Sequence, residues 1–244
     1  MIASIGRFGF FVATFASASV RNTPPWARIV EEAYKIGVFS LPILLIISTF
    51  VGTNLALQGY NAFAPLGGQS LVGMFVARAG VREMAPIMVA AMVASKAGTE
   101  MASQIAVMKI RDQVDALEVM AINPYWYLVT PRFFGIILVL PALTMISIFT
   151  LLSASYVVSV YQLGLNGSEW ISLASQNIHL WDFAACSVKS IVFGVIICLV
   201  SCYCGFTTNP GPSGVGQATN AAVVLSAMLC AVLNYLLSEL LFRD

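Results

Sequence analysis

The chain has 244 residues, of which 59% are hydrophobic and only 9% are charged, and its formal net charge is +1. Soluble domains carry about 25% charged residues, so a chain this apolar cannot be a soluble protein. The composition therefore indicates a polytopic membrane protein, and the absence of a basic cluster excludes nucleic acid as a partner.

Residues 1–35 are predicted to form an interfacial helix followed by a joint. The first part is apolar apart from Arg7, as expected for a helix in the membrane interface with that arginine among the headgroups. The small-residue run Ala16-Ser17-Ala18 resembles a cleavage site, so the alternative interpretation is a cleaved signal peptide. The joint is turn-rich at Thr23-Pro24-Pro25, and Trp26 suits the aromatic belt at the membrane boundary.

The apolar stretches that follow are long enough to cross a bilayer core, which takes about 20 helical residues. They predict five transmembrane helices, at residues 36–57, 71–108, 133–160, 183–204 and 218–238. The second stretch is too long for a simple span, because about 1.5 Å per residue carries it well past a core of about 30 Å. We expect a kink at Pro86, where a proline interrupts the helix.

The second stretch also carries charges, which are costly at membrane depth and usually face a bundle interior or a wet cavity. These residues are Arg78, Arg82, Glu83, Lys96 and Glu100. A row of small residues on the same stretch lets another helix approach closely, either within one subunit or in a second copy. That row is Ala90, Ala94, Gly98, Ala102 and Ala106.

Residues 109–123 are the one stretch that reads like the surface of a soluble protein, and they predict a short amphipathic helix. The apolar stripe is Ile110, Val114 and Leu117, and the acidic stripe is Asp112, Asp115 and Glu118. Asn123-Pro124 should end the helix, because a residue before proline is pushed out of the α region. The pattern fits either a solvated loop helix or a docking helix for a soluble partner.

The distribution of lysine and arginine predicts the orientation in the membrane. Positive residues occur before the first span and around residues 109–132, whereas the turns at residues 58–70 and 161–182 have none. Positive loops stay in the cytoplasm. The N-terminus and residues 109–123 are therefore predicted to be cytoplasmic, and five spans would place the C-terminus outside.

We predict no catalytic residue, no metal site and no cofactor in this chain. The five cysteines fall almost entirely in apolar runs, and Cys202-x-Cys204 lacks the spacing of metal ligands. A glycine-rich turn carries Gln217 and Ala218 where a phosphate loop needs lysine and a hydroxyl. The single histidine, His179, has no nucleophile in a recognisable pattern nearby.

The stretch from Arg82 to Arg132 resembles the MlaE-type permeases, the membrane subunits of MCE-associated ABC transporters that move phospholipids in bacteria. The matching runs are Arg82-Glu83-Met84-Ala85-Pro86, Lys96-Ala97-Gly98, Met108-Lys109, Asp112-Gln113, Asp115-Ala116-Leu117-Glu118-Val119-Met120, Asn123-Pro124 and Pro131-Arg132. Leu57-Gln58-Gly59 and the run from Gly214 to Thr219 resemble two further family signatures. Met84-Ala85 in place of Leu-Gly and Gln217 in place of an arginine depart from the family pattern.

This resemblance implies one permease domain over residues 1–244. Its fold would be all-α, with an interfacial (elbow) helix, five transmembrane helices and a short cytoplasmic coupling helix. The implied assembly is a homodimer with an ABC ATPase subunit, which holds ATP and Mg, and an MCE-domain protein outside. The implied location is the bacterial inner (cytoplasmic) membrane, in preference to the chloroplast inner envelope, where relatives also occur.

The resemblance also implies functional residues. A phospholipid cavity at the dimer interface would be lined by Leu55, Leu57, Arg82, Glu83 and Met84. There Arg82 would pair with a phosphate, and Glu83 with Arg82 or a headgroup amine; the structural alternative is an Arg–Glu pair that only ties helices together. Coupling to the ATPase is expected from Ile110, Asp112, Val114, Asp115, Leu117 and Glu118.

A second function stays open from the residues alone. A stand-alone secondary transporter would use the intramembrane charges Lys96, Glu100 and Lys189 for ion coupling. Such a protein would transport along a gradient as a purified single chain, whereas an ABC permease would require a separate ATPase.

Overall fold

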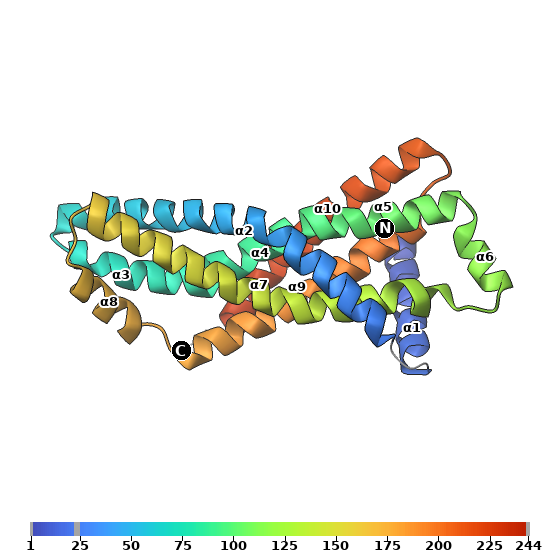
Figure 1. The fold of residues 1–244 in the computed structure, drawn as a ribbon, viewed down its shortest axis with the longest axis horizontal. Helices are drawn as coiled ribbons and strands as arrows, with labels where there is room; N and C mark the ends of the chain where they lie inside the picture. The colour runs from blue at the N-terminus through green and yellow to red at the C-terminus, as the bar shows by residue number, and fades with distance from the viewer. Residues whose placement is uncertain (1, 22–24, 243–244) are drawn as a thin grey trace. The chain divides into compact units, whose positions relative to one another are not determined.

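The computed structural model describes residues 2–21 and 25–242, and the regular structure in these ranges is helical (Figure 1). The chain forms two compact units, each assembled from three separate segments. Unit 1 comprises Met1–Phe39, Ala90–Val139 and Val192–Ala231, and unit 2 comprises Ser40–Val89, Leu140–Ile191 and Val232–Asp244. Several helices therefore contribute residues to both units.

The long helices cover the predicted N-terminal helix and most of the predicted spans. They are α1 (Ile2–Arg21), α2 (Trp26–Phe63), α7 (Thr130–Val157), α9 (Leu180–Phe206) and α10 (Pro212–Leu241). Within the described residues, four helical stretches are long and apolar enough to cross a membrane, and they run over Trp26–Leu66, Tyr125–Gln162, Leu180–Phe206 and Pro212–Leu241. The prediction of an all-helical polytopic membrane protein is confirmed.

The predicted span at residues 71–108 is not among these four. It is helical but divided into α3 (Val72–Phe75), the π-helix η3 (Val76–Met84), α4 (Ala85–Val93), the π-helix η4 (Ala94–Gly98) and α5 (Thr99–Ile110). The irregularity precedes Pro86 instead of beginning at it, because π-helical turns have already changed the register of the hydrogen bonds. A fifth transmembrane helix here remains a prediction.

The core of unit 2 forms where α2, α3, η3 and α7 meet. Leu55, Val76 and Leu151 are buried there, together with Trp170 from the short helix α8 (Gly167–Gln176). The predicted turn at residues 161–182 thus contains a helix, which the buried tryptophan packs against α3. Figure 1 shows α8 beside α3 at one end of the drawing.

The small-residue row lies in unit 1, where it packs against the same chain. All four of its alanines are buried. A Cβ added at Gly98 would lie 2.9 Å from Ser201 Oγ, and one added at Gly205 would lie 2.9 Å from the carbonyl oxygen of Ala102. The row therefore brings α5 against α9 within one subunit, which is one of the two alternatives left open by the sequence.

At the N-terminal end, α1 packs by its aromatic face. The ring of Phe11 lies 5.6 Å from Tyr125 and 5.7 Å from Tyr203, while Arg7 is exposed. The predicted joint at Thr23-Pro24 lies outside the described residues. Because α2 already begins at Trp26, the charged residues before the predicted first span are helical.

The close approach of α2 and α7 in unit 2 is testable at Gly52. A Cβ added there would collide with the carbonyl oxygen of Leu151, and a backbone atom cannot move aside cheaply. We expect Gly52→Ala to lower the stability of the detergent-solubilised protein by about 1–3 kcal/mol, as for other overpacked sites. Thermal unfolding measures this effect. Gly216→Ala is the control, because nothing lies within 4 Å of its added Cβ, and equal melting of the two variants would contradict the packing.

Candidate functional site

The candidate site is built around the backbone just before Pro86. In a regular α-helix, the N–H of Ala85 would donate to Val81 O, and the N–H of residue 86 would donate to Arg82 O. Here the Ala85 N–H donates to Gly80 O in a π-helical turn, and proline has no N–H. Two consecutive carbonyl groups therefore lose their α-helical donors.

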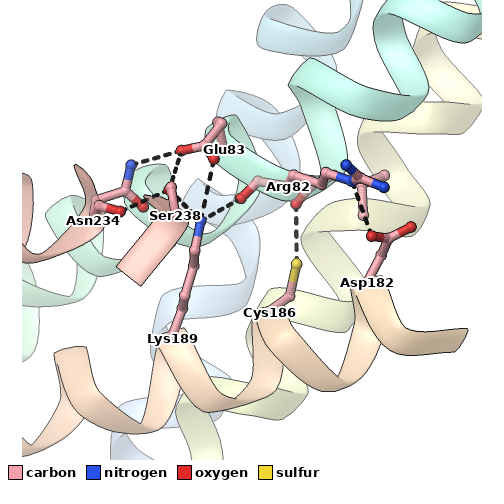
Figure 2. A network of polar contacts seen from close by, with 8 residues as sticks. Arg82, Glu83, Asp182, Cys186, Lys189, Asn234 and Ser238 are labelled. Carbon is pink, nitrogen blue, oxygen red and sulfur yellow. Dashed lines mark hydrogen bonds and ion pairs between the residues drawn. The ribbon is translucent and has the colours of Figure 1, made fainter. Parts of the chain in front are cut away.

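Helix α9 supplies replacement donors to both carbonyls (Figure 2). Cys186 Sγ donates to Val81 O over 3.2 Å, and Lys189 Nζ donates to Arg82 O over 2.8 Å. The ammonium also donates to Ser238 Oγ over 2.7 Å and to Glu83 Oε1 over 3.3 Å. These three acceptors use all three ammonium donors, which explains how a fully buried lysine is accommodated.

Glu83 joins this cluster to α10. Its Oε2 accepts hydrogen bonds of 2.9 Å from Asn234 Nδ2 and 2.9 Å from Ser238 Oγ, while its Oε1 pairs with Lys189. The side chain remains 39% exposed. One carboxylate therefore ties η3, α9 and α10 together and still presents part of its surface.

Arg82 forms the second ion pair of the site. Its Nε lies 2.9 Å from Asp182 Oδ1, and Asp182 is almost fully buried, whereas the arginine side chain is 23% exposed. The ring of Phe242 lies 4.8 Å from the Arg82 guanidinium carbon and 4.9 Å from Lys189 Nζ. The site therefore presents one cation and one carboxylate, each held by a buried partner of opposite charge.

This arrangement differs from the expected one. Arg82 and Glu83 both take part, but each pairs with a residue of α9 and not with the other. Of the apolar residues predicted to line a cavity, Met84 is exposed and Leu57 is half-buried. Leu55 is only 5% exposed and belongs to the core of unit 2, so within one chain it packs against neighbours and does not face a cavity.

Sequence reasoning missed Asp182, Cys186, Asn234 and Ser238, and it considered Lys189 only for ion coupling. A signal was present in the helical spacing. Three of these residues recur at i, i+4 and i+7 along α9, and the other two at i and i+4 along α10. Polar side chains repeated on one face of an apolar helix indicate an interior contact.

The ion-coupling residues of the secondary-transporter hypothesis are divided between the two units. Lys96 and Glu100 belong to unit 1, with the Lys96 ammonium 5.7 Å from the ring of Phe39. Lys189 belongs to unit 2, where its three donors are already used. Its geometry is that of a structural anchor and does not favour this hypothesis.

The predicted coupling helix is shorter than residues 109–123. Helix α6 covers Gln113–Val119 and is bounded by Asp112 and Ala121, which have left-handed φ angles of 56° and 60°. Ile110 belongs to α5, and Lys109 pairs with Asp115 over 3.1 Å. The left-handed residues stop the helix before Asn123-Pro124 is reached.

The apolar stripe of this segment faces its own chain. Val114 and Leu117 are buried against Leu128, so they anchor α6 and are not available to a partner as predicted. The other side of the segment is exposed, with Val119 at 88% and Met120 at 60% of their full surface. The acidic residues Asp112, Asp115 and Glu118 are also exposed. The surface open to a partner is therefore acidic with an apolar end.

Comparison with known proteins extends over nearly the whole chain. Residues 29–240 match the family described as Permease MlaE. A probable ABC transporter permease protein of Rickettsia typhi is 35% identical over 98% of this chain and 93% of its own length. One from Synechocystis is 35% identical over 88% of this chain and 81% of its own length. Protein TRIGALACTOSYLDIACYLGLYCEROL 1, chloroplastic, of Arabidopsis thaliana is 32% identical over 89% of this chain and 62% of its own length.

The role of Lys189 as an anchor can be tested by a double-mutant cycle. We expect Lys189→Met to destabilise the protein by about 3 kcal/mol, because it removes one partner of a buried ion pair and leaves Arg82 O without a donor. Adding Glu83→Gln should recover part of this loss, since the carboxylate then no longer lacks its cation. Thermal unfolding of the four proteins measures the coupling. Strictly additive effects would show that the pair contributes nothing.

Proposed function

The chain belongs to the MlaE permease family, and on that premise we propose that it is the membrane subunit of an ABC transporter that moves phospholipids. Two of its relatives are named as probable ABC transporter permeases, and a third is named after a galactolipid. As a permease, the chain is a transport subunit and not an enzyme. ATP and Mg are expected on a separate ABC ATPase subunit.

The observation that carries this proposal is the partly exposed pair Arg82 and Glu83 among apolar helices. A phospholipid headgroup always offers a phosphate, and many headgroups add an amine. A guanidinium is well suited to a phosphate and a carboxylate to an ammonium, because both contacts are charge-assisted hydrogen bonds. The buried partners Asp182 and Lys189 hold these two groups in place. Binding of a headgroup therefore costs little side-chain conformational entropy.

We place the lipid cavity around Arg82, Glu83, Met84 and Leu57, with Leu55 supporting its wall from the core. A homodimer would complete the cavity, and an MCE-domain protein would continue the path outside the membrane. These two partners, and the bacterial inner membrane as the location, follow from the likeness of the sequence to the family.

For coupling to the ATPase, we propose the exposed side of the α6 segment. Asp115 and Glu118 suit basic residues of a partner, and Val119 and Met120 suit an apolar groove beside them. Val114 and Leu117 contribute indirectly by fixing α6 on Leu128. Replacing either buried residue would test folding and not docking.

Lipid binding at Arg82 can be tested with a photoactivatable phospholipid added to the purified transporter. We expect Arg82→Ala to lower crosslinking about tenfold or more, because a charged hydrogen bond to the phosphate is lost. The ATPase should still co-purify. Arg78→Ala is the matched control, since this arginine is exposed on the same π-helix. Unchanged crosslinking in the Arg82 variant would leave the residue a purely structural role.

Docking can be tested at Val119, the most exposed apolar residue of the segment. We expect Val119→Asp to abolish co-purification of the ATPase without lowering the melting temperature, because an added charge opposes burial in an apolar groove. Ile171→Asp on α8 is the control, since it is also an exposed aliphatic residue, in a segment predicted to lie outside. Retention of the ATPase by the Val119 variant would refute docking through this surface.

A further inference from the structure

The end of α10 covers the charged site with an aromatic ring. Phe242 follows the last residue of the helix and continues its turn, since its N–H donates to Ser238 O over 2.9 Å. The ring lies within 5 Å of both the Arg82 guanidinium carbon and Lys189 Nζ, at 4.8 Å and 4.9 Å. These distances are within the range of cation–π attraction.

This last turn follows a turn that is bonded directly to the charged site. Ser238 and Asn234 each bond to the Glu83 carboxylate over 2.9 Å, and Ser238 also accepts from Lys189. Beyond them, Leu241 O accepts a 3.3 Å hydrogen bond from Trp181 Nε1, and this tryptophan is 62% exposed. Opening of the last turn at Phe242 would leave the bonds of Asn234 and Ser238 to Glu83 intact.

The two cations near the ring differ in how their hydrogen-bond donors are used. The three donors of Lys189 already have acceptors. Arg82 has five donors. Among the described residues, the acid that Arg82 meets is Asp182, which lies 2.9 Å from its Nε. A phosphate can take both terminal nitrogens in a bidentate contact, which is stronger than the contact with a ring.

We propose that Phe242 is a displaceable lid on Arg82, which a phosphate-bearing lipid headgroup expels when it binds. The proposal rests on the proposed function, because it takes a phospholipid as the ligand. The lid makes binding selective: a lipid without a phosphate has no group that can replace the ring on Arg82, so the ring stays in place and such a lipid binds through its acyl chains alone. Phe242 is thus a specificity-determining residue that acts by competing with the headgroup.

The test replaces Phe242 by phenylalanines carrying one, two or three ring fluorines, in the full transporter. Fluorine withdraws charge from the ring face and weakens the cation–π contact with little change of shape. We expect the affinity for phosphatidic acid to rise stepwise along the series, by about two- to tenfold in total. Diacylglycerol with the same acyl chains should bind equally weakly throughout. The same replacements at Phe149, an exposed ring of α7 in unit 2, should change nothing.

A second measurement follows the lid directly. The ¹⁹F resonance of 4-fluorophenylalanine at position 242 should shift on titration with phosphatidic acid, but not with diacylglycerol. An equal shift with inorganic phosphate alone would overturn the assignment to a lipid headgroup.

The failures are distinguishable. If lipid binding depends on Arg82 but is flat across the fluorinated series, the lid is refuted and the proposed function stands. If binding is indifferent to Arg82→Ala, the lid and the proposed headgroup contact at Arg82 both fail.

Discussion

A single missing backbone donor organises the site of this permease. Pro86 cannot donate to the carbonyl group of Arg82, and the π-helical turn before it also frees the carbonyl of Val81. Buried carbonyl groups without donors are costly, so the helix that packs there must bring donors with it. Helix α9 does so with Cys186 and Lys189. Because the lysine also bonds to α10, one ammonium group fixes three helical segments relative to each other within unit 2.

The same anchoring determines which charges remain partly exposed. Asp182 and Lys189 are buried, and each neutralises a partner that is partly exposed. Burying a pair of charges costs desolvation energy, so such pairs add little to stability by themselves. Their benefit here is geometric. Arg82 and Glu83 are held as a preformed cation and carboxylate at the surface of an apolar bundle, where charges would otherwise be rare.

The proposed site and the proposed docking segment belong to different units of the chain. Arg82 and Glu83 are in unit 2, and α6 is in unit 1. Helices α7 and α9 contribute residues to both units and provide a covalent connection between them. In unit 1, Val114 and Leu117 of α6 pack against Leu128, which lies just before the long helix α7. The residues of α7 continue from unit 1 into unit 2.

The amino-acid sequence by itself determined the membrane class, four of the spans, the family and the two charges Arg82 and Glu83. The reason is that apolar length and intramembrane charge are local properties, which can be read along the chain. Only the tertiary structure decided the partners of these charges, because those depend on the face that each distant helix presents. The same holds for α6. Its helical periodicity reveals an apolar stripe at Val114 and Leu117, but only the packing of these residues against Leu128 shows that the stripe faces the protein interior.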